Sequence, residues 1–198
     1  RTQISLQMLE SQQKFSLEDV QRLTFNTRMP LADRVKPALI EAVKRTAQPS
    51  EALTLGLRAL EGWDNHVSEE SRGGVLFQRF WDTYRAAVHR PYAVEWDPNR
   101  PIETPLGLSD PALAVKHLED AVGWTRETYG AEDVQWGEVH RIRLGDIDLP
   151  ADGASGRYGL FHNVQFGEAE DGTRVVGKIK PDGPFVGGAT GWLILVEF

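Results

Sequence analysis

The sequence contains no cysteine among its 198 residues. This absence excludes a disulfide framework, a zinc site built from thiolates and a cysteine nucleophile. It does not separate cytoplasm from periplasm, because a chain without cysteine is compatible with both compartments.

The chain also lacks an excess of positive charge and a long apolar run. Its 22 basic and 29 acidic residues give a formal net charge of −7. This balance argues against a nucleic-acid-binding protein and against a polybasic membrane-surface protein. No apolar run approaches the roughly 20 residues that a membrane span needs. The 40% of hydrophobic and 26% of charged residues are ordinary for a soluble globular chain of one domain or two small ones.

Start signals are missing from the N-terminus. The chain begins with Arg1 rather than Met, and no signal-peptide pattern follows. Residues 1–6 are typical of the interior of a helix that has no cap before it. We expect the chain to be cut from a longer polypeptide; a trimmed tag or a numbering choice is the alternative.

Helical spacing of apolar residues begins at the N-terminus. The first stretch predicts a helix with one apolar face, formed by Ile4, Leu6, Met8 and Leu9. Ser16 and Asp19 form a capping-box pattern, which predicts a second helix to about residue 26. We expect the apolar residues of this helix to face inward: Leu17, Val20 and Leu23.

The same criteria predict four more helices, at about 30–46, 51–60, 75–89 and 111–129. Pro37, in the middle of the first of these, predicts a kink or a break. The third carries a four-residue apolar repeat that is typical of a core stripe: Leu76, Phe80, Tyr84 and Val88. Between the last two, prolines interrupt regular structure, and several apolar anchors predict a packed excursion over 90–108: Tyr92, Trp96, Ile102 and Leu106.

The last third of the chain predicts strands separated by glycine turns. Imperfect alternation predicts a strand over 174–180, and the apolar run 192–198 predicts a strand buried on both faces. The predicted fold class is therefore α+β. A helical segment over 1–130 is followed by mostly antiparallel strands over 131–198, together forming one incomplete domain.

The common catalytic and metal-binding motifs are absent from the sequence: G-x-S-x-G, the P-loop, G-x-G-x-x-G and H-E-x-x-H. Asp146 and Asp148 stand two apart without further ligand types nearby, so a metal site is not favoured. Five histidines are candidate general bases: His66, His89, His117, His140 and His162. We expect structural roles for His89 and His117. His140 and His162 stay open between core packing, the commoner case, and catalysis.

The six tryptophans are many for this length. Exposed tryptophans stack sugars in binding modules, whereas tryptophans interleaved with core positions, such as Trp81 and Trp192, fill a core. Both interpretations stay open for Trp96 and Trp124. A non-catalytic binding module that uses Trp63, Trp96 or Trp124 is therefore the alternative function.

Four stretches of the sequence occur in an order that resembles a known family. They are the run 1–20, the pair Leu60–Asp64 and Ser71–Phe77 with Phe80 and Trp81 after it, the W-G-x-x-H pattern Trp136–His140, and the run Gly188–Phe198. Together they resemble the large subunit of the penicillin amidase family of N-terminal nucleophile hydrolases, in its acyl-homoserine-lactone and aculeacin acylase branch.

The resemblance implies an amidohydrolase. In that family a precursor is cut autocatalytically into two subunits, and the new N-terminal serine of the large subunit attacks a linear amide. Its own α-amino group, with an ordinary pKa near 8, serves as the base. Backbone N–H groups and an asparagine stabilise the oxyanion. The resemblance implies that the nucleophile and this asparagine lie upstream of this chain, which is then inactive alone.

The resemblance also implies partners, location and site residues. The partners are the rest of the large subunit, the small subunit and an amide substrate such as a penicillin side chain, an N-acyl-homoserine lactone or a lipopeptide, with no nucleic acid. Arg1 falls where the family has an arginine that orients the active-site network; a solvent-facing helix arginine is the alternative. His140 is expected to be structural. No cofactor is implied, although a structural calcium occurs in the family, and the location is periplasmic or extracellular. The expected architecture is the layered αββα arrangement, with the last strand joining a sheet from outside this chain.

Overall fold

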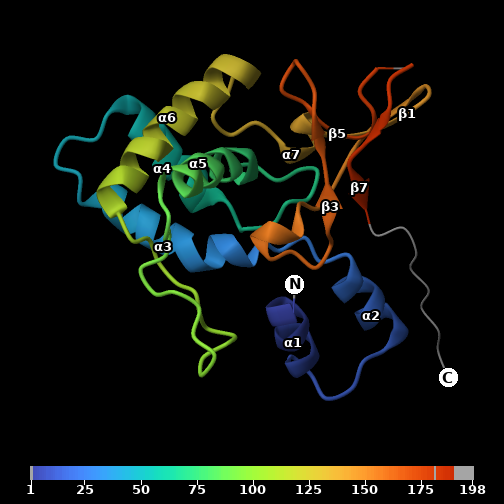
Figure 1. Cartoon of the computed structure of the whole chain (residues 1–198), viewed down its shortest axis with the longest axis horizontal. Coiled ribbons are helices and arrows are strands. Elements are labelled where there is room, and N and C mark those ends of the chain that lie inside the picture. Colours follow the sequence, from blue (N-terminus) through green and yellow to red (C-terminus); the bar gives the residue numbers. More distant parts are fainter. Residues whose placement is uncertain (1, 181, 190–198) are drawn as a thin grey trace.

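The computed structural model of the chain describes residues 2–180 and 182–189 (Figure 1). The predicted site residue Arg1 and the predicted strand 192–198 lie outside the described residues. The helices, in chain order, are α1 (Thr2–Glu10), α2 (Leu17–Thr24), α3 (Pro30–Lys44), α4 (Glu51–Gly62), α5 (Gly74–Ala87), α6 (Pro111–Tyr129) and the short α7 (Trp136–Val139). The strands and one 3₁₀ turn follow: β1 (His140–Leu144), β2 (Ile147–Pro150), η1 (Gly156–Tyr158), β3 (Val164–Gln165), β4 (Gly167–Glu168), β5 (Arg174–Lys178), β6 (Phe185–Val186) and β7 (Gly188–Ala189).

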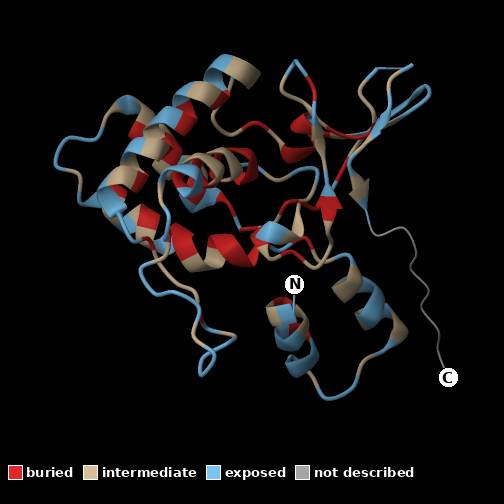
Figure 2. Ribbon diagram, viewed as in Figure 1, coloured by how far each residue is buried: buried red, intermediate tan, exposed pale blue. Residues whose placement is uncertain are grey.

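The long helix α6 lies at the centre of the helical part and packs against α3, α4 and α5. Its inner face is built from small and branched residues: Ala114, Leu118, Ala121, Val122 and Thr125. Gly56 permits α4 to approach closely, because a Cβ at this position would lie 2.8 Å from Cγ2 of Val122. The buried residues therefore concentrate where these helices face one another, as Figure 2 shows.

The local signals at the helix ends are confirmed. The Ser16 hydroxyl accepts from the N–H of Asp19, whose carboxylate accepts from the N–H of Ser16, so α2 begins with a capping box. Asp110 caps α6 by accepting from the N–H of Leu113 at 2.9 Å. The same helix ends at Gly130, whose φ of 84° is the left-handed conformation of a C-cap.

Pro37 lies inside α3 without ending it, so of the two predicted alternatives the break is wrong and the kink stays a prediction. Proline removes one helical hydrogen bond and crowds the preceding turn. Burial compensates here, since the helix is held along its length by core side chains: Leu31, Ala32, Val35, Leu39 and Val43.

The two N-terminal helices lie at one side of the helical body (Figure 1). Ile4 and Met8 are buried as expected, but Leu6 and Leu9 are exposed. The prediction that the apolar residues of α2 face inward is wrong for Val20, which is exposed, whereas Leu17 and Leu23 are half-buried. An amphipathic pattern fixes which face of a helix is apolar, but it does not supply a surface to cover that face.

The proline-rich excursion 90–108 is packed against the helices as expected. The Arg34 guanidinium donates to the carbonyls of Ile102 and Thr104, each at 2.7 Å, which ties the excursion to α3. Tyr92 packs against the core cluster. The prediction that Trp96 is an anchor of this excursion is wrong, because its side chain is 56% exposed.

The strands form an open sheet in the order β2-β1-β5-β4, with β6 also paired to β5, and a separate pair of β3 with β7. β1 and β5 are parallel, and the other pairs of the described strands are antiparallel. The α+β class with mostly antiparallel strands is confirmed. As a division between domains, the boundary at residue 130 stays a prediction.

Candidate functional site

Two of the stretches that carry the family resemblance lie together at the junction between helices and sheet. The Trp136 N–H donates to the carbonyl of Ser71, and the Gly137 N–H to that of Glu69, both at 2.8 Å. Gly137 is required by space, because a Cβ there would lie 2.7 Å from Cβ of Pro150. Two stretches some 65 positions apart in sequence, Ser71–Phe77 and Trp136–His140, therefore form one joint in the fold.

The Leu60–Asp64 motif is also tied into this framework. The buried Lys36 ammonium donates to the carbonyls of Leu60 and Trp63, at 3.1 and 2.5 Å. It thus neutralises the carbonyl end of α4, where a cation is stabilised by the helix dipole. Burial lowers the pKa of Lys36, and the nearby Asp33 and Asp64 partly oppose that shift. The motif residues of this chain join and pack structural elements.

His140 is fully buried at the start of β1. Its ring stacks on that of Trp136, with the centroids 3.5 Å apart and the planes 5° apart, and meets the edge of Phe166. Nδ1 lies 3.1 Å from the Trp136 carbonyl, which can only accept, so Nδ1 carries the proton. Nε2 has no hydrogen-bond partner among the described residues.

This environment keeps His140 neutral. Burial lowers its pKa to about 3, opposed by the bond to the Trp136 carbonyl and reinforced by the positive charge of Arg174. A general base must be exposed to its substrate and titrate near the working pH. His140 meets neither condition, and its contacts are those of the structural residue that the sequence favoured.

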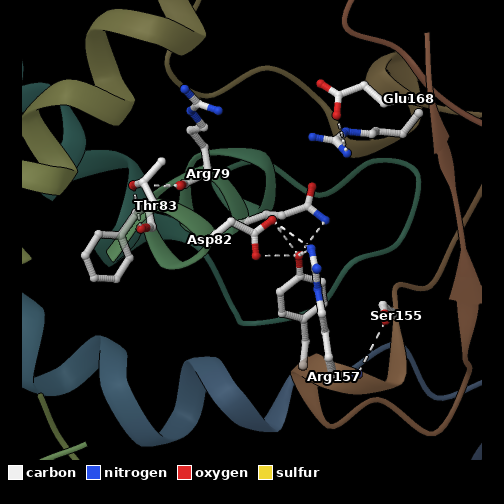
Figure 3. Close-up of polar contacts among 10 residues, drawn as sticks. Arg79, Asp82, Thr83, Ser155, Arg157 and Glu168 are labelled. Atoms are coloured by element: carbon white, nitrogen blue, oxygen red, sulfur yellow. Dashed lines mark hydrogen bonds and ion pairs between the residues drawn. The ribbon is translucent and has the colours of Figure 1, made fainter. Parts of the chain in front are cut away.

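A polar cluster that the sequence did not predict joins η1 to α5 (Figure 3). Figure 3 shows Arg157 and Asp82 pointing toward one another from these two elements, with Nη2 of Arg157 2.8 Å from the carboxylate. The Tyr158 hydroxyl donates to the same carboxylate at 2.9 Å. Gln78, one helical turn before Asp82, donates to the Tyr158 oxygen at 3.3 Å.

Burial governs the ionisation of this cluster. It raises the pKa of Asp82, against the opposing effects of Arg157 and the Tyr158 hydroxyl. Burial and the neighbouring Asp82 charge raise the pKa of Tyr158 to about 12, so the phenol keeps its proton. Since the carboxylate is engaged by two donors, the cluster acts as a tether between elements.

Two hollows lie beside this tether, and Arg157 lines both of them. The larger, about 670 Å³, is an open cleft that is also lined by Asp82, Arg85 and His89. The smaller, about 210 Å³, reaches His140 and Arg174. The larger one is lined by ionisable groups, and no serine, threonine or cysteine hydroxyl or thiol is among its lining residues.

The other histidines are dispersed. His117 contacts the Thr83 hydroxyl at 3.1 Å, and His66 contacts that of Thr27 at 3.2 Å. The Thr83 hydroxyl already donates to carbonyls of its own helix. These pairs are the described contacts that most resemble a nucleophile with its base, and neither lines one of the two hollows beside the tether.

His162 and His89 are each in different surroundings. His162 packs its ring against Phe25, with centroids 5.7 Å apart. Burial lowers its pKa, and Asp152 partly opposes the shift. His89 is exposed beside the larger cleft. The structure therefore brings no two of the described histidines into one site.

The three candidate tryptophans lie in different surroundings, and the structure does not bring them together into one platform. Trp63 is buried and donates its indole N–H to the carbonyl of His66. Trp124 is covered by the Arg79 guanidinium, 4.2 Å from its ring centroid. Trp96 alone of these three candidates is exposed, and a single ring is a weak surface for a sugar.

Of the two acidic candidates for a metal site, Asp148 is engaged in ion pairs. Asp148 pairs with Arg141 at 2.8 Å and with Arg143 at 3.1 Å, and Asp146 is exposed at the turn of the hairpin. Within residues 2–180 and 182–189, no group of three or more acidic or histidine side chains could hold a metal ion. The absence of a cofactor stays a prediction.

Comparison with known proteins agrees with the order of the motifs. The family model described as penicillin amidase matches residues 1–192. Two proteins named acyl-homoserine lactone acylase PvdQ, from two strains of Pseudomonas fluorescens, are 27% and 30% identical over 185 and 165 residues. The matches cover 89% and 79% of this chain but only 23% and 21% of those relatives. A protein of the same name from Pseudomonas syringae pv. tomato is 26% identical over 86% of the chain. The chain therefore spans about a quarter of the length of the curated relatives it matches.

Proposed function

The chain belongs to the penicillin amidase family, and from that premise we propose that it is an internal part of the large subunit of an acylase. The observation that carries the proposal is the family match over residues 1–192. The acylase hydrolyses a linear amide, and an N-acyl-homoserine lactone is the substrate class favoured by the names of the relatives.

The catalytic serine of this proposed enzyme lies upstream of Arg1. It becomes the N-terminus of the large subunit by autocatalytic processing, attacks the amide carbonyl and passes its proton to its own amino group. That amino group then gives the proton to the leaving amine as the C–N bond breaks, which leaves the acyl group as an ester on the serine. The acyl group is then released by water. Two observations support this division of labour: the chain spans only a fraction of its relatives, and the hydroxyl–histidine contacts described above lie outside the two hollows beside the tether.

The part played by this chain is to support the active site. The helices α3 to α6 pack on one another, and the joint at Trp136 and Gly137 attaches the sheet to them. Arg1 stands directly before α1 in the sequence. We propose that it orients the upstream asparagine and nucleophile. Rigid support of this kind matters, since misplacing reacting groups by about 1 Å costs on the order of 10²-fold in rate.

The location of the enzyme is proposed to be periplasmic or extracellular, and its precursor an inactive zymogen. Among the described residues, no helix combines the length and apolar character that a membrane crossing requires.

The experiment is an assay of the full-length polypeptide that carries this chain. Hydrolysis of an N-acyl-homoserine lactone at the amide releases a fatty acid and a primary amine in equal amounts, which amine labelling and mass spectrometry detect. Penicillin G in a parallel reaction tests the other substrate class. Opening of the lactone ring without release of an amine, or no turnover of either substrate by folded protein, would contradict the proposal.

A further inference from the structure

The hairpin of β1 and β2 presents an apolar face that no described residue covers. The strand register places Ile142 opposite Leu149 and Leu144 opposite Ile147. Directly opposed residues of an antiparallel pair point to the same side of a sheet. These four side chains are 42% to 54% exposed, so four aliphatic groups form one contiguous surface, here called the hairpin face.

The opposite side of the hairpin is polar and satisfied. Arg141 and Arg143 on β1 both pair with Asp148 on β2, three side chains that alternate with those of the hairpin face. The two strands therefore alternate polar and apolar residues, as in a sheet with one solvent-facing side and one buried side. In the described chain, the apolar side, which such a pattern normally buries, is exposed.

The outer edge of β2 has few free backbone groups with which another strand could pair. Pro150 has no N–H to offer, and the Asp148 carbonyl already accepts from Nη2 of Arg141 at 3.0 Å. A partner at this hairpin is therefore held by its side chains on the hairpin face, and continuation of the sheet is disfavoured.

The hairpin face is continuous with the interior of the sheet. Ile142 lies beside Val176 of the parallel strand β5, and Val176 is only 9% exposed. The exposed end of the hairpin is pale blue in Figure 2, at one end of the sheet. Exposed apolar residues elsewhere are common on soluble proteins when they stand singly, whereas a contiguous patch marks an interaction site.

We propose that the hairpin face is a docking surface for an apolar segment of the same polypeptide that lies outside residues 1–198. This inference rests on the proposed function, because it assumes the longer acylase of which this chain is a part. The curated relatives supply the length: their matched regions are 23% and 21% of their chains, which leaves more than three quarters of each to pack around the matched part.

Charge disfavours the other occupants. A second copy would bring together two chains of net charge −7. It would also place the exposed carboxylate of Asp146, at the turn of the hairpin, near the interface. An anionic lipid surface is repelled by the same charges. The occupant is therefore an uncharged, aliphatic or aromatic surface.

Photo-cross-linking in the full-length polypeptide tests the docking surface. Benzoylphenylalanine replaces Leu144 in one variant and Ile147 in a second, so that a folding failure of one leaves the other. The matched control replaces Val94, an aliphatic residue of similar exposure in the excursion 90–108. Cross-linked peptides are identified by mass spectrometry.

The expected result is an intramolecular cross-link from position 144 or 147 to a peptide outside residues 1–198. A cross-link to a second copy, cross-links only within residues 1–198, or none at both positions would overturn the inference. Cysteine variants give a rate to compare: Leu144→Cys is expected to react with maleimide at least tenfold more slowly than Val94→Cys. Reaction at the same rate in the folded protein counts against docking.

These readouts do not depend on catalysis. The expected cross-link in a protein that hydrolyses no amide would leave the docking surface in place and refute the proposed function. Amide hydrolysis without the cross-link would do the reverse.

Discussion

His140 shows how packing sets the protonation of a single residue. Its ring lies between Trp136 and Phe166, and its Nδ1 proton is directed at a backbone carbonyl. Five histidines are visible in the sequence, but their burial is not. The favoured structural role of His140 therefore rested on how common buried histidines are, and the structure supplies the reason.

A first prediction concerns stability against pH. The pKa of His140 is lowered from 6.5 to about 3 by burial, so its contribution is fully present above pH 6.5. As pH falls from 6.5 toward 3, the unfolded chain takes up a proton that the folded chain refuses, and stability falls by about 1.4 kcal/mol per pH unit. His140→Asn should flatten this slope in urea unfolding. His89→Asn, at an exposed histidine, should leave it unchanged, and equal slopes in all three proteins would contradict the account.

A second prediction concerns Arg1, whose role is carried by the family resemblance alone. If Arg1 orients the upstream active-site groups, Arg1→Lys should lower kcat of the full-length enzyme by about 10²-fold with little change in KM. Lysine keeps the charge but loses the planar, two-pronged donor geometry of arginine. Arg22→Lys, on the exposed surface of α2, is the control. Equal activity of both variants would mean that Arg1 is an ordinary helix arginine.

At the scale of elements, the sequence predicts helix caps correctly, but it does not predict the contacts between residues that are far apart in the chain. Ser16, Asp110 and Gly130 act on neighbours within a few residues, so their patterns predict caps without knowledge of the fold. The contact of Asp82 with Arg157 joins residues 75 positions apart, and no periodic pattern connects them. The parallel pairing of β1 with β5 is equally invisible to spacing. The prediction that the apolar residues of α2 face inward is wrong at Val20, because an amphipathic pattern does not show which element, if any, covers the apolar face.

The approach of α4 to α6 gives a third prediction. Gly56→Ala should destabilise the protein by about 1–3 kcal/mol, since its Cβ would lie 2.8 Å from the stiff, buried Val122 side chain. Gly123→Ala is the matched variant, because its Cβ would meet nothing within 4 Å. It should stabilise α6 by about 0.5–1 kcal/mol through its helix propensity. Chemical denaturation measures both, and equal effects would show that the helices do not depend on a close approach.

The tether between η1 and α5 gives a fourth prediction. Tyr158→Phe removes one of the donors to the half-buried Asp82 carboxylate and should cost about 1.5–3 kcal/mol of unfolding free energy. Tyr92→Phe, at a phenol for which the structure gives no hydrogen bond, should change stability by less than about 0.5 kcal/mol. A loss of equal size in both variants would show that ring packing, rather than the hydroxyl, holds the tether.

At the scale of the whole molecule, the described chain is a helical body joined to an open sheet at the joint of Trp136 and Gly137. The core extends across this joint, since it includes Trp136, Val139, Tyr158 and Leu160 together with the helical residues. Among the described residues, one side of the β1–β2 hairpin is left without cover, and the hydroxyl–histidine contacts of Thr27 and Thr83 lie outside the two hollows beside the tether. Both features fit a piece of a larger enzyme whose reacting groups lie elsewhere.

The most direct test of that central claim is to trap the acyl-enzyme of the full-length protein and locate the acyl group by peptide mass spectrometry. Rapid acid quenching during turnover of an N-acyl-homoserine lactone preserves the ester. The account predicts one acylated residue, the N-terminal serine of the large subunit, outside residues 1–198. An acyl group on a serine or threonine within residues 1–198 would contradict it.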